Sequence, residues 1–291
     1  MAPPVWRSLL FVPATSAKFV ASAPKRGADA IILDLEDSVA PERKDEARAA
    51  LQGHIAFLAN LGQTIIVRVN NDPKHLGLDL TAAARPGVRA IMLPKIESPG
   101  ELAKIDRQVS DVEARAGLTN QSLGAIALIE SPRAVFAAPL IADASNRLLG
   151  LGFGSEDFSA AAGIAPTRDG LSGPGQWVAM AAAQNGLQAI GLAGSIASIA
   201  DLAELAELAS YSRRIGMTGC VCIHPDQVPV FNAAFGIGEA EYRAAIALCE
   251  AFETALSAGT AAIAFRGRMV DKPVYDRALA LCERYRAQGA G

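Results

Sequence analysis

The sequence has no surplus of basic residues and no long apolar run. Lysine and arginine number 27 against 30 aspartate and glutamate residues, a formal net charge of −3, so nothing indicates a surface for nucleic acid. No apolar run is long enough to cross a membrane. The first residues, MAPPVWRSLLFVP, lack a charged leader and a cleavage site, and we therefore expect a cytoplasmic protein.

Cysteine and histidine are also few. The four cysteines predict reduced, structural thiols. With only three histidines, a His-rich zinc site is not expected. By contrast, 51% of the 291 residues are hydrophobic, which is ample for a large core. This length suits an α/β barrel, which routinely reaches roughly 250 residues as one domain.

Short apolar runs alternate with longer amphipathic segments such as 42–61 and 197–216. The runs are almost wholly apolar, which is typical of strands covered on both faces. This repeat predicts a (β/α)8 TIM barrel. An open doubly wound sheet is the alternative, although no GxGxxG motif opens a helix. The expected strands are residues 7–14, 29–37, 64–70, 90–97, 124–130, 147–154, 186–193 and 219–225.

The chain after about residue 230 does not continue this repeat. Residues 239–259 predict one long helix, and 261–288 predict a short hairpin followed by a last helix. We therefore expect a TIM-barrel catalytic domain at 1–230 and a C-terminal helical arm at 231–291. We further expect the arm to pack on a neighbouring subunit.

Acidic and basic side chains recur at the ends of the expected strands, where TIM barrels carry their chemistry. Glu130 closes one apolar run and Asp157 follows the next. Carboxylates are rarely left in apolar surroundings without a partner, and two that converge on one mouth suit a hard cation such as Mg²⁺. On spacing alone, Glu156 is an alternative to Asp157.

Two cations at strand ends have two possible roles. Arg68 and Lys95 could pair with buried acids or face a substrate, and the sequence favours the second role. The second strand ends in a cluster of three acids, Asp34, Glu36 and Asp37. At least one of these acids is expected only to support the others.

Eight stretches of the chain, taken together and in order, match one known family. They are RSLLFVP (7–13), DAIILDLEDSVAPERKDEAR (29–48), VRVN (67–70), MLPKIES (92–98), ALIESP (127–132), GSEDF (154–158), IHPDQV (223–228) and AFRGRMVDKP (264–273). On these stretches the chain resembles the citrate lyase β-subunit and malyl-CoA lyase family, also called HpcH/HpaI aldolase–citrate lyase. The resemblance implies a Mg²⁺-dependent carbon–carbon lyase that cleaves a citramalyl-, malyl- or citryl-CoA-like substrate to acetyl-CoA and a keto acid. It also implies a homotrimer or a hexamer.

The family pattern also implies residue roles. Glu130 and Asp157 would bind the metal, and Arg68 would hold the thioester or enolate oxygen. Glu36 and Asp37 would support the metal through its waters. The substrate-binding residues implied by the resemblance are Phe11, Arg68, Lys95, Glu130 and Glu156.

Asp271, in the MVDKP stretch, resembles an acid that reaches the active site of a neighbouring subunit. Such an acid can protonate the enolate carbon. The chain departs from the family at Ala14, Ser16 and Cys220, near the expected CoA grip, so the sequence leaves open how CoA would be held.

Two other functions remain open. A class II 2-keto acid aldolase acting on free acids commonly places a histidine after an early strand, and the first two strand ends hold none. A weakly active binding or scaffold subunit of a lyase complex is the second alternative.

Overall fold

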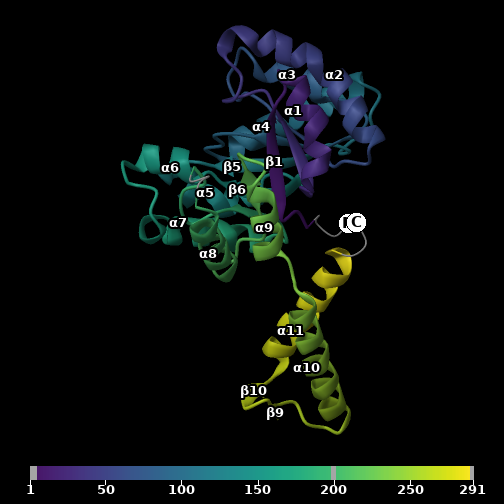
Figure 1. Cartoon of the computed structure of the whole chain (residues 1–291), viewed down its shortest axis with the longest axis vertical. Coiled ribbons are helices and arrows are strands. Elements are labelled where there is room, and N and C mark those ends of the chain that lie inside the picture. The colour runs from purple at the N-terminus through teal and green to yellow at the C-terminus, as the bar shows by residue number, and fades with distance from the viewer. Residues whose placement is uncertain (1–4, 198–200, 289–291) are drawn as a thin grey trace. The chain divides into compact units, whose positions relative to one another are not determined.

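The structure is a computed structural model that describes residues 5–197 and 201–288, without the side chains of residues 287 and 288. The chain divides into two compact units, Met1–Phe235 and Gly236–Gly291. Figure 1 shows the first unit as strands surrounded by helices, and the second as two long helices with a hairpin. In the described residues, no helix has both the length and the apolar character of a membrane span.

Within the described residues, eight parallel strands form the barrel of the first unit. Neighbours pair in chain order from β1 to β7, and β8 pairs with β1. An isolated bridge from Ile190 to Gly219 brings β7 to β8, so the ring is nearly closed. This closure confirms the TIM-barrel class and excludes the open sheet. The strands are β1 (Ser8–Pro13), β2 (Ala30–Asp34), β3 (Ile65–Arg68), β4 (Val88–Leu93), β5 (Gly124–Ile129), β6 (Leu148–Phe153), β7 (Gln188–Gly191) and β8 (Cys220–Cys222).

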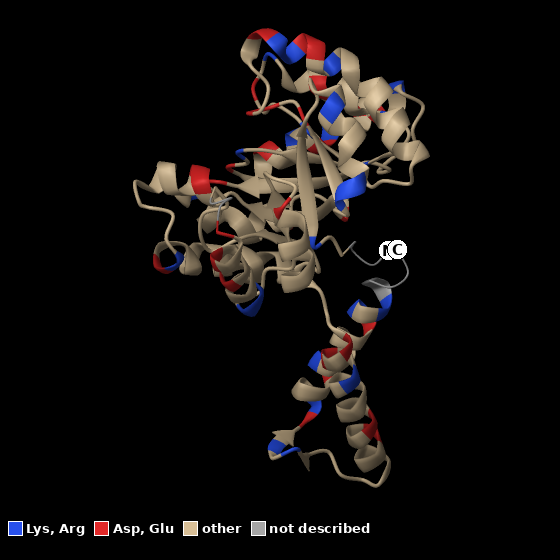
Figure 2. Cartoon of the chain, viewed as in Figure 1, with Lys and Arg blue, Asp and Glu red and all other residues tan. Residues whose placement is uncertain are grey.

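Helices follow the strands and cover the outside of the barrel (Figure 1). Figure 2 shows that most charged residues lie on these helices and in loops, while the strands are largely uncharged. The helices of the first unit are α1 (Ala17–Ser22), α2 (Lys44–Asn60), α3 (Leu76–Ala83), α4 (Pro99–Arg115), α5 (Pro132–Ala142), α6 (Ser155–Ala162), α7 (Arg168–Gln184), α8 (Leu202–Arg214) and α9 (Gln227–Phe235).

The strands are buried on both faces, which explains their continuous apolar runs. Ile31 and Leu33 of β2 belong to the layer between the strands and the helices, while Ile32 faces the interior of the barrel with Ile66 of β3. Alternate residues of one strand therefore fill two separate cores, and the interior is packed by side chains.

Several elements are shorter than the sequence predicts. β2 ends at Asp34, β3 at Arg68 and β4 at Leu93, so Glu36 and Lys95 lie in the loops that follow. In these loops some backbone groups still bond to the next strand, as Leu35 N–H does to the Arg68 carbonyl, but others bond to side chains, as Glu36 N–H does to Asp34. Of the helix expected at 197–216, residues 198–200 lie outside the described residues, and α8 begins at Leu202.

The second unit is a helical hairpin. Its elements are α10 (Glu239–Ser257), the antiparallel strands β9 (Ile263–Phe265) and β10 (Arg268–Val270), and α11 (Lys272–Gln288). The small core contains Ala245, Cys249, Ala278 and Cys282. All four cysteines of the chain are free and buried, as the prediction of structural thiols requires.

Candidate active site

A cavity of about 460 Å³ opens at the carboxyl ends of the barrel strands. Its wall contains six of the predicted site residues, namely Phe11, Asp37, Arg68, Glu130, Glu156 and Asp157. Glu36 and Lys95 are not on the wall but contact residues that are. Asp271 belongs to the second unit, where its carboxylate accepts a long hydrogen bond of 3.4 Å from the Val274 N–H.

Arg68 is held by the acids of the β2 loop. Its Nε and Nη2 donate to the two carboxylate oxygens of Asp34 at 2.6 and 2.7 Å, a bidentate pairing that fixes the guanidinium plane. Nη1 lies 2.9 Å from Glu36 and 3.5 Å from Asp37. The guanidinium carbon also stands 4.4 Å from the ring centre of Phe11. Arg68 therefore takes both roles that the sequence left open, partner of acids and cation on the cavity wall.

Asp34 is the anchor of this cluster and is fully buried. Its carboxylate also accepts hydrogen bonds from the N–H groups of Glu36 and Ser38. Burial alone would raise the pKa of Asp34, but the hydrogen bonds and charge of Arg68 hold that pKa below its ordinary value. Asp34 is thus the supporting acid that the sequence expected without identifying it.

Glu36 lies between two cations. Its Oε1 accepts a hydrogen bond from Lys95 Nζ at 2.9 Å, and its Oε2 forms the ion pair with Arg68. That ion pair lacks hydrogen-bond geometry, since buried Oε2 has no hydrogen-bond partner in the described residues. Burial raises the pKa of Glu36, although Arg68 and Lys95 act in the opposite direction.

The backbone of Lys95 is strained. Its φ of 55° lies in the left-handed region, which is rare for a residue with a long side chain. In this conformation the Lys95 N–H donates to Glu130 Oε2 at 2.7 Å. Strain of this kind tends to persist where function requires it, and here it positions Lys95 against two acids of the cluster.

Glu130 is a buried carboxylate at the end of β5. Burial raises its pKa to about 7; the hydrogen bond from Lys95 opposes this shift, and the charges of Asp157 and Glu36 add to it. Within the described residues, Oε1 of Glu130 has no hydrogen-bond donor. The site therefore concentrates negative charge that its own residues do not neutralise.

The loop after β6 completes the acidic wall. Gly154 passes so close to Glu130 that a Cβ at this position would stand 2.6 Å from Oε1, so any other residue would displace the Glu130 side chain. Gly154 precedes α6 without a side-chain cap, which leaves the first N–H groups of α6 open to an anion. Glu156 accepts a hydrogen bond from Ser195 Oγ, whereas Asp157 is exposed on the wall.

The site could accept a metal through few protein ligands. In the described residues, no group of three or more His, Cys, Asp or Glu side chains is arranged to hold an ion. In the described part of the wall, Glu130 and Asp157 are two carboxylates that pair with neither Arg68 nor Ser195. Mg²⁺ is commonly bound by one or two carboxylates, with water or substrate oxygens as its other ligands.

Lys44 is a supporting residue that the sequence did not reveal. Its Nζ donates to the carbonyl oxygens of Leu35 and Glu36 at 2.8 and 2.7 Å, and to Asn70 Oδ1 at 2.8 Å. These bonds tie the Glu36 loop to the end of β3. The sequence did contain a hint of this role. Lys44 stands at the N-terminus of α2, where a cation interacts unfavourably with the helix dipole, so its presence there suggests a contact elsewhere.

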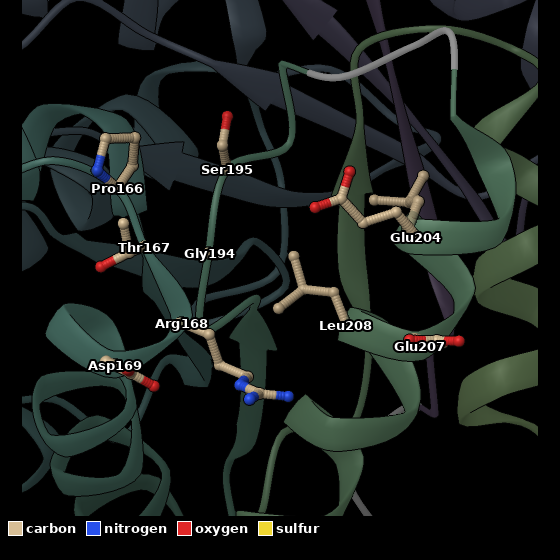
Figure 3. Close-up of a pocket in the computed structure, with 10 residues that line it drawn as sticks. Pro166, Thr167, Arg168, Asp169, Gly194, Ser195, Glu204, Glu207 and Leu208 are labelled. Carbon is tan, nitrogen blue, oxygen red and sulfur yellow. The ribbon is translucent and has the colours of Figure 1, made fainter.

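A second cavity, of about 490 Å³, lies between the start of α7 and α8 (Figure 3). Arg168 and Asp169 reach it from α7, and Glu204 and Glu207 from α8. These side chains are exposed, and no predicted site residue lines this cavity. The charged side chains of this second cavity are solvated and mixed in sign. We therefore place the candidate active site in the smaller cavity at the mouth of the barrel.

Comparison with known proteins gives matches over nearly the whole chain. The family model described as HpcH/HpaI aldolase/citrate lyase matches residues 7–225. The citrate lyase subunit beta of Escherichia coli (strain K12) is 32% identical over 97% of this chain and 94% of its own. An L-malyl-CoA/beta-methylmalyl-CoA lyase of Rhodobacter capsulatus is 29% identical over 91% of this chain and 90% of its own.

Solved structures agree. CitE from Mycobacterium tuberculosis, crystallised in complex with magnesium, acetoacetate and coenzyme A, matches with a TM-score of 0.76 and 30% identity, covering 98% of both chains. The fold is therefore shared with this structure.

Proposed function

The chain belongs to the HpcH/HpaI aldolase/citrate lyase family, and we propose that it is a Mg²⁺-dependent carbon–carbon lyase. Its substrate would be a short β-hydroxyacyl-CoA, cleaved to acetyl-CoA and a keto acid. One observation carries this proposal. Glu130, a buried carboxylate whose Oε1 meets no donor in the described residues, lines the same cavity as the carboxylate of Asp157, as expected of a pair that faces a hard cation.

Glu130 and Asp157 are the residues that we assign to hold Mg²⁺. Both offer carboxylate oxygens, the donors that this hard cation prefers, and Gly154 keeps the space beside Glu130 Oε1 open. When bound, Mg²⁺ supplies a Lewis acid for the hydroxyl and carboxylate oxygens of the substrate. The magnesium in the CitE structure supports this assignment.

The reaction breaks the bond between Cα and Cβ of the thioester. The hydroxyl loses its proton to a base, the O–H electron pair forms the C=O of the keto acid, and the electrons of the broken bond form the acetyl-CoA enolate. We assign Arg68 to the enolate oxygen, because Asp34 fixes its guanidinium on the cavity wall. Asp37, an exposed carboxylate on the same wall, is the base that we assign to the hydroxyl proton.

A panel of substrates tests this proposal. With Mg²⁺ present, purified protein should release acetyl-CoA and a 2-keto acid from at least one of malyl-, citramalyl- and citryl-CoA. Free 4-hydroxy-2-keto acids, the aldolase substrates, should remain intact. Cleavage of the free acids alone would replace the lyase by an aldolase. Tight thioester binding without any turnover would indicate a scaffold subunit.

We propose that the enolate is protonated by Asp271 from a neighbouring copy. The second unit buries few apolar side chains of its own. Because so small a core stabilises a unit only weakly, contact with a neighbouring copy would add stability to it. Co-expressed Glu130→Gln and Asp271→Asn chains should then recover about a quarter of wild-type activity. Half of the barrels keep Glu130, and half of the arms that reach them keep Asp271. Each variant alone should be inactive, and no recovery in mixed oligomers would show that Asp271 does not act across subunits.

A further inference from the structure

Asp79 is a fully buried carboxylate that the proposed reaction does not use. It belongs to α3 and is not among the described residues that line the barrel cavity. Its Oδ1 accepts a hydrogen bond from Arg48 Nη1 at 2.7 Å. Its Oδ2 accepts from the backbone N–H and from Nδ2 of Asn70, at 2.8 and 2.6 Å. Because both oxygens are bound, this carboxylate is a fixed anchor for the chain that follows β3.

Asn70 links this anchor to Lys44. Its Nδ2 donates to Asp79 and also to the Leu35 carbonyl oxygen at 2.9 Å, while its Oδ1 accepts from Lys44 Nζ at 2.8 Å. A side-chain amide offers both a donor and an acceptor, so Asn70 binds a carboxylate and an ammonium group at once. Neither Asn70 nor Lys44 is among the described residues of the cavity wall, so neither is placed to contact a molecule bound there.

This chain of contacts ends on the backbone of Glu36. Lys44 Nζ donates to the Glu36 carbonyl oxygen at 2.7 Å, and Asp34 accepts the Glu36 N–H at 2.9 Å. Glu36 is therefore held through both of its backbone groups. Its carboxylate meets two cations of the site, Arg68 Nη1 and Lys95 Nζ, each at 2.9 Å. A shift of the Glu36 loop would move the partner of both cations.

We infer that Lys44, Asn70 and Asp79 are positioning residues for the reaction. They hold the Glu36 loop, and this loop in turn sets where the Arg68 guanidinium stands against the enolate oxygen. The inference rests on the proposed function, in which Arg68 stabilises that oxygen as its charge develops. A misplacement of about 1 Å that arises far from the chemistry can lower a rate by roughly 100-fold. Loss of these contacts should therefore lower kcat more than it raises KM.

The Lys44→Met variant tests this inference, with Lys104→Met on the exposed face of α4 as its matched control. Lys44 is partly exposed, so water can replace its Nζ at the carbonyl oxygens and the variant should fold. For the thioester that the wild type cleaves best, we expect kcat to fall by about tenfold or more. Mg²⁺ affinity should not change, because both assigned metal ligands stay in place. Lys44→Arg should recover much of kcat, since a guanidinium also offers several donors.

A second variant tests the part of the chain that lies beyond Lys44. Asn70→Ala loses the side-chain bonds but keeps the backbone N–H that Asp79 accepts. Its kcat should fall as in Lys44→Met, and the double variant should lose little more, because both changes break the same chain of contacts. Wild-type kcat in folded Asn70→Ala would remove Asn70 and Asp79 from the positioning role.

A double-mutant cycle with Glu36→Gln shows whether Lys44 acts through the Glu36 side chain. In that background Lys44→Met should lower kcat by less than about threefold, because the ion pair that it positions is already lost. An equal loss in both backgrounds would overturn the inference and leave the lyase intact. So would Lys44→Met with wild-type kcat and only a lower free energy of unfolding. A wild-type protein that cleaves none of the thioesters would instead remove the proposed function.

Discussion

The Glu130→Gln variant is expected to lose at least roughly 10³-fold in kcat/KM for its CoA thioester while it keeps its fold. A metal acting as Lewis acid contributes several kcal/mol to the transition state, and each 1.4 kcal/mol is about a tenfold change in rate. The fold should survive because a neutral amide is less costly than a carboxylate at this buried position, and its oxygen can still accept the Lys95 N–H.

Steady-state kinetics and Mg²⁺ calorimetry on the same protein check this expectation. Asp157→Asn should behave like Glu130→Gln, with weaker Mg²⁺ binding and little turnover. Glu97→Gln is the matched control, since Glu97 follows β4 but does not line the cavity. Retained Mg²⁺ affinity in both Glu130→Gln and Asp157→Asn would place the metal ligands elsewhere.

The Arg68→Met variant is expected to lose about 3–5 kcal/mol of unfolding free energy near pH 7, as well as its activity. Methionine fills the space of the side chain but leaves the buried carboxylate of Asp34 without its cation and that of Glu36 with Lys95 alone. Breaking a buried pair from one side has this cost. Urea unfolding measures the loss. Arg107→Met, on the exposed face of α4, should change stability by no more than about 0.5 kcal/mol.

The loss in Arg68→Met should also depend on pH. In the wild type, Arg68 holds the pKa of Asp34 below its ordinary value in the folded state. A lowered pKa contributes stability above the unfolded value, and this contribution disappears as the pH falls through the folded value. Without Arg68, burial would raise the pKa of Asp34 above its ordinary value. The gap between wild type and Arg68→Met should therefore be widest near neutral pH and should narrow as the pH falls through the raised pKa of the variant towards the lowered pKa of the wild type. A gap that stays constant with pH would mean that Arg68 stabilises the fold by packing alone.

The barrel was predictable because its strands carry an unusual signature. Ile31, Ile32 and Leu33 are consecutive and all buried, a pattern that arises only when both faces of a strand are covered. The strand ends were less predictable. The backbone after Asp34 looks extended in sequence, but beyond the bond from Leu35 N–H to β3 it is held by the side chains of Asp34 and Lys44.

The site was predictable in its acids and less so in its supporting contacts. Glu130 and Asp157 stand out because each follows an apolar run. The anchoring of Arg68 by Asp34 was not predictable, because a sequence does not say which of three neighbouring acids a cation will choose. The place of Ile190 and Val221 on the cavity wall was equally hidden, since both are ordinary strand residues in the sequence until the ring brings β7 and β8 beside the acids.

The Mg²⁺ dependence of acetyl-CoA release tests the central claim most directly. Protein treated with a chelator would be supplied with malyl- or citramalyl-CoA, and acetyl-CoA would be measured as Mg²⁺ is restored. The account predicts no release without the metal and saturable recovery with it, in wild-type protein but not in Glu130→Gln. Equal release with and without Mg²⁺, or no release from protein shown by calorimetry to bind Mg²⁺, would contradict it.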